Sequence, residues 1–283
     1  MNTKNNGVAT YYSRFGSWAG YNMMLGRSQH AGYWTSETKN ERQAQANFLR
    51  MFAKELQLKQ TDRVLDAGSG QGVMARHLVR ANGGGEVIGI TITPREVKIS
   101  EKLSRHMSPA PRFVLGDYSH TDFPDEYFDV VYVNETLSHA KDMRATMQEF
   151  YRILKQGGRV VFADYEVDAR HMSVRQQRMM DFLEQHAGGF GVRQQNPGEI
   201  SQALQQAGFA DISETDWTEA VMPTYHRLRS LARPFAWIQP DAKLAPFFVN
   251  AVMASHGYST LYEAGLFRYL LYKGTKPLAH RAK

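Results

Sequence analysis

The chain has 283 residues and no cysteine, and it also lacks long apolar runs, internal repeats and low-complexity tracts. Without cysteine, disulfide bonds, a thiolate zinc site and a cysteine nucleophile are excluded. No apolar run reaches the roughly 18 residues that mark a membrane-spanning helix. The polar start, Met1–Gly7, lacks the charged-then-apolar order of a signal peptide. We therefore expect a soluble, cytoplasmic protein with no metal centre and no stable membrane insertion.

The net charge is moderately positive, at +6. A positive surface attracts anions and nucleic acids. The basic residues, however, are spread along the whole chain, without a Lys/Arg-rich block or an RNA-binding signature. The composition therefore favours a mildly basic enzyme over a nucleic-acid-binding protein.

Between residues 61 and 167, apolar strands alternate with helices, an order typical of a parallel sheet. We expect strands at 63–67, 86–92, 112–115, 128–133 and 159–164. The helices between them are expected at 72–81, 94–107 and 144–154, with turns at 83–85 and 157–158. Upstream, residues 8–60 are expected to be helical. Downstream, we expect helices at 171–187 and 197–207 and strands at 210–217 and 267–273.

The first of these strands ends in an acidic residue and runs into a glycine-rich turn, Asp66-Ala67-Gly68-Ser69-Gly70-Gln71-Gly72. Such a turn builds a nucleotide-sized pocket at the carboxyl edge of an open α/β sheet, because glycine adopts positive φ and lets a ligand approach the backbone. A dinucleotide fingerprint would require glycine at position 73, which is valine. The spacing instead resembles the first motif of the class I methyltransferases that use S-adenosylmethionine. The resemblance implies a cofactor site that contains Asp66, Ala67, Gly68, Gly70 and Gly72.

The second strand tip, Thr91-Ile92, lacks the acidic residue that usually accepts hydrogen bonds from both ribose hydroxyls. A threonine at this position resembles the sterol, tocopherol, cyclopropane-fatty-acid and prenyl-diphosphate C-methyltransferases. In several of these a glutamine five residues further on reaches the ribose, which implies that Thr91, Ile92 and Glu96 contact the cofactor here. The alternative is that Glu96 is a surface residue in the first turn of a helix, where the helix dipole favours it.

After the third strand, Gly116-Asp117-Tyr118 resembles the adenine motif of these enzymes. The resemblance implies that the Asp117 carboxylate accepts the exocyclic amine and that Tyr118 stacks on the ring. An aspartate between a strand and a loop is also ordinary turn chemistry.

The fourth strand ends in Asn134-Glu135, and His139 follows four residues later. A glutamate at the tip of a buried apolar strand is costly unless it has a partner or a water-filled cavity. Prenyl-diphosphate methyltransferases carry a similar Asn-Glu-Ser, and sterol-type enzymes carry a Glu followed by a His four residues on. The resemblance implies that Asn134 contacts the cofactor and that Glu135 lies beside the transferred methyl group.

An upstream segment contains Tyr11, Tyr12 and Tyr21 and then the turn Gln29-His30-Ala31-Gly32-Tyr33-Trp34. It resembles the lid of sterol- and quinone-type methyltransferases, which implies that Gln29 and His30 lie near the amino acid end of the cofactor. Aromatic residues near a terminus can equally be packing anchors.

The resemblance implies an α/β fold with a Rossmann-like doubly wound sheet of seven strands. It further implies an N-terminal helical lid at 1–60 and a methyltransferase domain at 61–283. A helical cap, inserted before the last strand, is expected at about 218–262.

The reaction that the resemblance implies is carbon methylation of an isoprenoid or prenyl diphosphate by S-adenosyl-L-methionine. Methylation of an alkene leaves a carbocation, for which Glu135 would supply a carboxylate and a base, and aromatic residues the walls. A diphosphate would also need cations. The candidates are Arg170, His171, Arg175, Arg178, Arg193, His226, Arg227, Arg229 and Arg233, although a solvated helix face explains them equally.

Three other functions are open at this point. An O- or N-methyltransferase would use His139 or His30 as a base with a pKa near neutrality. A partner subunit would have the methyltransferase fold but no catalytic activity. A dehydrogenase is disfavoured by Val73 and by the missing acidic residue at the second strand tip.

Overall fold

The computed structural model describes residues 28, 30–82, 85–186, 195–232 and 257–279. The chain divides into two compact units. Unit 1 contains Met1–Met51, Tyr165–Pro197 and Asp216–Leu270, and unit 2 contains Phe52–Asp164, Gly198–Thr215 and Leu271–Lys283. The division into a lid, a methyltransferase domain and a cap stays a prediction.

A seven-stranded sheet with the order β3-β2-β1-β4-β5-β7-β6 confirms the predicted Rossmann-like α/β fold. The strands are β1 (Arg63–Ala67), β2 (Glu86–Thr91), β3 (Arg112–Leu115), β4 (Phe128–Asn134), β5 (Leu154–Val167), β6 (Ala210–Asp216) and β7 (Phe267–Thr275). Strands β1 to β5 pair in parallel. Strand β7 runs antiparallel to β5, because Gly157 pairs with Lys276 at one end and Asp168 with Leu266 at the other.

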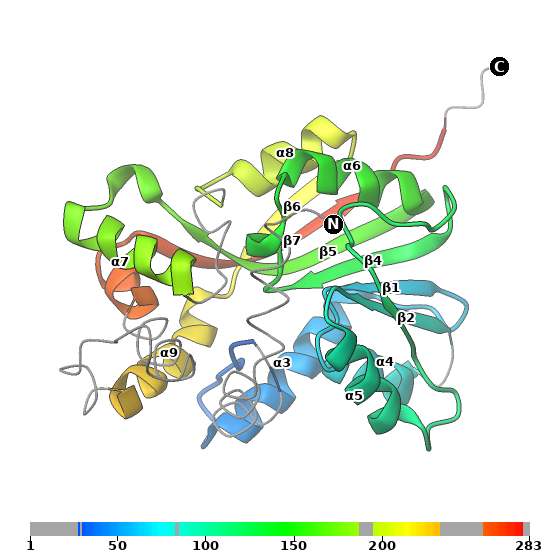
Figure 1. The fold of residues 1–283 in the computed structure, drawn as a ribbon, viewed down its shortest axis with the longest axis horizontal. Coiled ribbons are helices and arrows are strands. Elements are labelled where there is room, and N and C mark those ends of the chain that lie inside the picture. Colours follow the sequence, from blue (N-terminus) through cyan, green and yellow to red (C-terminus); the bar gives the residue numbers. More distant parts are fainter. Residues whose placement is uncertain (1–27, 29, 83–84, 187–194, 233–256, 280–283) are drawn as a thin grey trace. The chain divides into compact units, whose positions relative to one another are not determined.

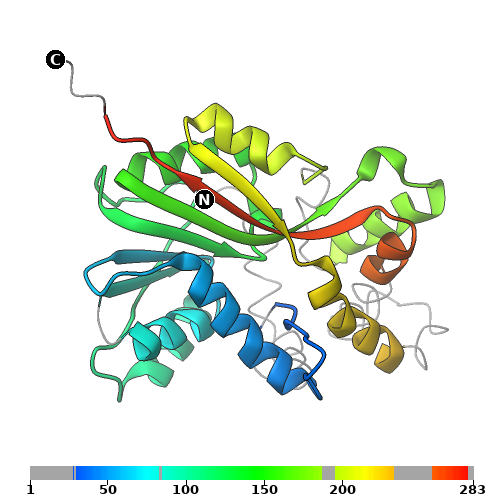
Figure 2. The same cartoon turned by 180° about the vertical axis from the view of Figure 1, so that it is seen from behind.

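Two helical layers cover the sheet within unit 2 (Figure 1). Helices α4 (Val73–Asn82) and α5 (Pro94–Ser104) pack on β2 and β3 on one face. Helices α6 (Met143–Ile153) and α8 (Glu199–Ala207) pack on each other over the opposite face, as the reverse view also shows (Figure 2). The described residues also form α3 (Glu41–Leu56), α7 (Val174–His186), α9 (Thr218–Ala232) and a helical segment at 257–263, with short 3-10 turns at Leu137–His139 and Ala169–His171. No helix of the described ranges is long and apolar enough to cross a membrane.

Strand β4 forms the centre of the core, because Phe128, Val130, Val131, Tyr132 and Val133 have no exposed surface. An apolar run of this kind is expected of a strand that is covered on both faces. The register places Ala67 of β1 beside both Ile90 and Val133, and Thr91 of β2 beside Leu115. The carboxyl ends of β1 to β4 therefore share one edge of the sheet.

Two predictions about local structure are wrong. Gly157 and Gly158 do not form a turn but lie inside β5, where four residues bulge out between the partners of Phe128 and Val130. Residues 30–40 are not helical, and the first described helix begins at Glu41. Residues 8–27, including Tyr11, Tyr12 and Tyr21, lie outside the described residues.

Candidate functional site

The glycine turn after β1 has the backbone that its sequence predicts. Gly68, Gly70 and Gly72 have φ values of +88°, +49° and +71°, which favour glycine because other residues rarely adopt them. A Cβ on Gly68 would lie 2.5 Å from the Thr136 hydroxyl, and one on Gly72 would lie 2.5 Å from the Phe113 ring. At these two positions a side chain would collide with Thr136 or Phe113, so the protein itself requires glycine there, whether or not a ligand is bound.

Asp66, at the end of β1, is buried next to this turn. Burial raises the pKa of its carboxyl group to about 7, against the opposing effects of the Tyr132 hydroxyl, the Ala75 N–H and the Arg76 charge. Asp66 lies beside Tyr132 of β4 in the sheet register, so it belongs to the interior of the sheet. Ala67, beside it, is also fully buried.

Four buried polar atoms around this edge have no hydrogen-bond partner in the part of the chain that the structure describes. They are Ser69 Oγ and Gln71 Nε2 in the glycine turn, Thr93 Oγ1 after β2 and Asn134 Oδ1 at the tip of β4. Buried polar atoms are rarely left unsatisfied. These donors and acceptors suit a polar ligand at this edge, and a cofactor with an amino acid group and a ribose provides both kinds of partner. Sequence analysis predicted Asn134 but missed Ser69 and Gln71, which alternate with the glycines of the motif.

Glu96 is buried, with only 6% of its surface exposed, so the surface alternative is wrong. The Thr91 hydroxyl donates a hydrogen bond to its carboxylate at 2.7 Å. Glu96, in the first turn of α5, thus places a carboxylate at the tip of β2, where the strand itself has none. Ile92, which follows Thr91 in the chain, is half-buried. A hydroxyl and a carboxylate at this position fit the diol of a ribose.

The loop after β3 holds Asp117 half-buried, and its carboxylate accepts the Ser119 N–H at 2.9 Å. Tyr118 is buried: its hydroxyl donates to the Thr136 carbonyl at 2.6 Å, and its ring lies 5.8 Å from that of Phe150. These interactions anchor Tyr118 in the interior, and its stacking on adenine stays a prediction. Leu115, by contrast, is 55% exposed at the tip of β3.

Glu135 follows the last residue of β4 and is half-buried. Its φ of +53° is left-handed, an uncommon conformation for a residue with a side chain. Strained backbone of this kind is concentrated at functional sites. His139, at the end of the 3-10 turn Leu137–His139, is also half-buried.

His30 is unsuited to act as a base near neutral pH. Only 7% of it is exposed, its Nδ1 lies 2.8 Å from the Ala31 carbonyl, and its ring lies 4.3 Å from that of Phe48. Burial lowers the pKa of His30 to about 4, so the expectation of a pKa near neutrality is wrong for this residue. Gln29 lies outside the described residues.

Within unit 1, the turn at residues 30–34 is fixed to α9. The Thr224 hydroxyl accepts the Gly32 N–H at 3.1 Å and the Trp34 indole N–H at 2.9 Å, and it donates to the Glu41 carboxylate at 3.1 Å. Segments expected to belong to a lid and to a cap therefore share one buried hydrogen-bond network. The proximity of His30 to a cofactor stays a prediction.

Four of the basic residues considered for a diphosphate are paired with carboxylates, and three others, Arg175, Arg178 and His226, form no ion pair with a described residue. Arg170 and His171 both contact Asp168, and Arg227 lies 3.6 Å from Glu41. Arg229 pairs with Glu263. Arg193 and Arg233 lie outside the described residues.

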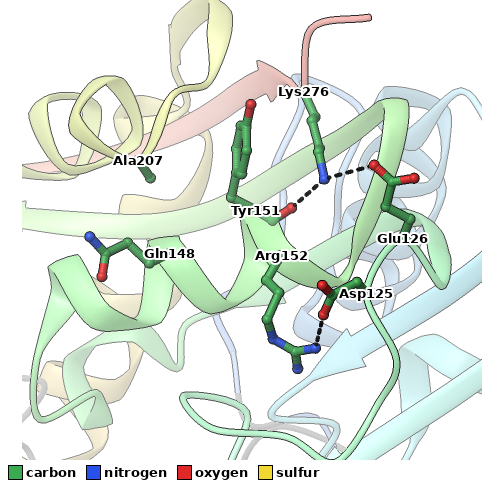
Figure 3. Close-up of a pocket in the computed structure, with 7 residues that line it drawn as sticks. All are labelled: Asp125, Glu126, Gln148, Tyr151, Arg152, Ala207 and Lys276. Atoms are coloured by element: carbon green, nitrogen blue, oxygen red, sulfur yellow. Dashed lines mark hydrogen bonds and ion pairs between the residues drawn. The ribbon is translucent and has the colours of Figure 1, made fainter. Parts of the chain in front are cut away.

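A cavity of about 660 Å³ lies elsewhere in unit 2, where β4 begins rather than where it ends (Figure 3). Its charged side chains neutralise one another: Arg152 contacts Asp125 at 2.6 Å, and Lys276 lies 3.5 Å from Glu126. Lys276 also donates to the carbonyl of Tyr151, near the end of α6, where a cation stabilises the helix dipole. The cavity is thus a structural feature away from the strand tips. In the described ranges no three His, Cys, Asp or Glu side chains are grouped so that they could hold a metal ion.

Comparison with known proteins agrees with this geometry. Residues 65–162 match the methyltransferase domain family. The S-adenosyl-L-methionine-dependent Diels-Alderase of Talaromyces variabilis is 27% identical over 95% of this chain and 94% of its own. The sterol 24-C-methyltransferase of Eremothecium gossypii is 30% identical over 56% of this chain and 37% of its own. Other relatives are named as O- and N-methyltransferases.

Among solved structures, geranyl diphosphate methyltransferase in complex with GPP and sinefungin has a TM-score of 0.73 and 16% identity, and the match covers 97% of this chain and 100% of that one. The fold, the glycine turn and the strand tips define a class I methyltransferase with a Rossmann-like sheet. These similarities support an S-adenosylmethionine-dependent methyltransferase of small molecules. This similarity argues against the dehydrogenase.

Proposed function

We propose that the enzyme methylates a carbon atom of a small, mainly apolar acceptor of the isoprenoid type, in a reaction of secondary metabolism. The observation that carries this proposal is the carboxylate of Glu135 at the tip of β4, held in a left-handed backbone conformation directly after Asn134. An oxygen or nitrogen acceptor needs at most a base for one proton. A carbon acceptor needs a carboxylate near a developing cation.

The cofactor supplies an electrophilic methyl group on a sulfonium. In the proposed reaction the bond from this methyl to an alkene carbon of the acceptor forms as the methyl–sulfur bond breaks, and S-adenosylhomocysteine is released. The neighbouring acceptor carbon becomes a cation, and an adjacent C–H bond then gives its electrons to a new double bond. Glu135 stabilises the cation and accepts the proton. One proton is released to solvent for each methyl group transferred.

Of the two isoprenoid acceptors, the uncharged one is favoured. A diphosphate requires arginine or histidine side chains that are free to bind it. Of the described candidates, Arg170, His171, Arg227 and Arg229 contact carboxylates, whereas Arg175, Arg178 and His226 form no ion pair with a described residue. The similarity to a sterol C-methyltransferase supports the same choice.

The test combines product analysis with the Glu135→Gln substitution. Mass spectrometry of reactions with a panel of sterols, quinones and prenyl diphosphates should identify the acceptor. Calorimetry with S-adenosylhomocysteine should give equal affinities for Glu135→Gln and for the wild type, while turnover of the variant falls by about a hundredfold or more, as expected for a general base. Unchanged turnover would exclude the role of Glu135. A variant His139→Gln that alone abolishes turnover would favour an oxygen or nitrogen acceptor.

A second candidate function is intramolecular [4+2] ring closure, favoured by the similarity to a Diels-Alderase over almost the full chain. Such a reaction rearranges bonds within one substrate and consumes no cofactor. It would give a product of unchanged mass and release no S-adenosylhomocysteine. The same mass spectra therefore separate the two functions.

A further inference from the structure

We propose that Thr136 is a positioning residue that fixes the glycine turn, the loop after β3 and Glu135 relative to one another. The part of this inference that concerns Glu135 rests on the proposed function. All of these residues belong to unit 2.

The side chain of Thr136 is bound to the start of the glycine turn. Its hydroxyl donates a hydrogen bond to the Ala67 carbonyl at 3.1 Å. A Cβ on Gly68 would lie 2.5 Å from Oγ1 and 2.7 Å from Cγ2 of Thr136, so the turn passes directly against this side chain. The first glycine of the motif and Thr136 are therefore complementary in shape, and the hydrogen bond fixes their separation.

The carbonyl of Thr136 holds the loop after β3. It accepts the Tyr118 hydroxyl at 2.6 Å and the His139 N–H at 3.0 Å. Tyr118 directly follows Asp117, the residue predicted to contact adenine. A shift of Thr136 would thus be transmitted to both parts of the predicted cofactor site.

Thr136 also constrains Glu135, its neighbour in the chain. A residue with a side chain keeps a left-handed backbone only where the surroundings enforce it. On the β5 side, the Glu135 N–H donates to the Ala163 carbonyl at 2.9 Å, and the Leu137 N–H donates to the Asp164 carboxylate at 3.0 Å. On the β1 side, the corresponding constraint is the hydroxyl of Thr136. Loss of the Thr136 hydroxyl would remove the constraint on the β1 side of Glu135 and change where the Glu135 carboxylate lies.

The first measurement needs no acceptor. Calorimetry of the full chain with S-adenosylhomocysteine should give Thr136→Ser an affinity within about threefold of the wild type, because serine keeps the hydroxyl. Thr136→Val keeps the shape but loses the hydroxyl, so its affinity should fall about tenfold. Ser201→Ala is the control, because it removes a hydroxyl of α8 that donates to Glu214 of β6, outside the predicted cofactor site, and should leave the affinity unchanged. Equal affinities for Thr136→Val, Thr136→Ser and the wild type would overturn the proposal.

Tyr118→Phe tests the same arrangement if Thr136→Val does not fold, because it removes only the hydroxyl that binds the Thr136 carbonyl. Its affinity for S-adenosylhomocysteine should fall several-fold, and an unchanged affinity would contradict the proposal.

The second measurement is kcat on the acceptor identified by mass spectrometry. Thr136→Val should lower kcat about tenfold in the wild type and have no further effect in Glu135→Gln, because residues that act through one another are not additive. If Glu135→Gln leaves turnover unchanged, the proposed function fails, while the binding measurement still decides the role of Thr136. If Glu135→Gln lowers turnover and Thr136→Val affects neither kcat nor affinity, the positioning role alone fails.

Discussion

Substituting Gly68 by alanine tests whether the glycine turn is shaped by the protein itself. With a φ of +88°, an alanine at this position should cost about 1–2 kcal/mol of stability from backbone strain. The new methyl would also lie 2.5 Å from the Thr136 hydroxyl, and overpacking of this kind costs about 1–3 kcal/mol. The two effects together predict that Gly68→Ala lowers the free energy of unfolding by about 2–5 kcal/mol.

A matched control separates the two contributions. Gly198 has a φ of +84°, but a Cβ there would meet nothing within 4 Å. Gly198→Ala should therefore cost only the backbone strain, about 1–2 kcal/mol, and leave S-adenosylhomocysteine binding unchanged. Urea denaturation gives both free energies, and calorimetry gives both affinities. Equal destabilisation by the two substitutions, or an S-adenosylhomocysteine affinity that Gly68→Ala leaves unchanged, would show that contact with Thr136 does not shape the turn.

Three further predictions concern buried ionisable groups. Because the pKa of Asp66 is raised to about 7, the folded state keeps a proton that the unfolded state loses between pH 4 and 7. The free energy of unfolding of the wild type should therefore fall as the pH rises over this range, by up to about 4 kcal/mol relative to that of Asp66→Asn. Urea denaturation measures both free energies, and the same pH dependence for the wild type and Asp66→Asn would contradict this expectation. The pKa of His30 is lowered to about 4, so the unfolded state binds a proton that the folded state does not as the pH drops from 7 to 5. The free energy of unfolding of the wild type should therefore fall relative to that of His30→Phe, by up to about 2 kcal/mol. A difference between the two proteins that does not change with pH would argue against a buried neutral ring. Glu96→Gln should weaken S-adenosylhomocysteine binding about tenfold in calorimetry, whereas Glu101→Gln, an exposed position on the same helix, should have no effect. Equal affinities of the two variants would remove Glu96 from the site.

The sequence was sufficient to predict the elements that follow from local pattern. Strands 63–67 and 112–115 have the predicted bounds, and the apolar run of β4 is buried as its composition indicates. The alternation of strands and helices was enough to place the strand tips at one edge, because parallel strands connected by crossover helices must end there.

Contacts between distant segments could not be predicted in this way. The burial of Glu96 depends on how α5 returns to the tip of β2, and the bond from Tyr118 to Thr136 depends on the placement of the loop after β3. The low pKa of His30 depends on its burial in unit 1, where its ring packs on Phe48. Tyr118 and His30 each contact a partner 18 residues away in the sequence, at a distance that no local periodicity encodes.

The conformation of Gly157 and Gly158 also could not be predicted from the local sequence. Their composition is typical of a turn, but pairing with Lys276, the residue directly after β7, draws them into β5 as part of a bulge. A partner more than a hundred residues away thus decides the local conformation.

The most direct test of the proposed carbon methylation is the position of the label after turnover with S-adenosylmethionine that carries a CD₃ group. Mass spectrometry would find the labelled product, and NMR would identify the atom that carries the label. We expect a CD₃ group bonded to an acceptor carbon, and little labelled product from Glu135→Gln. A label on oxygen or nitrogen, or a ring-closed product without label, would contradict it.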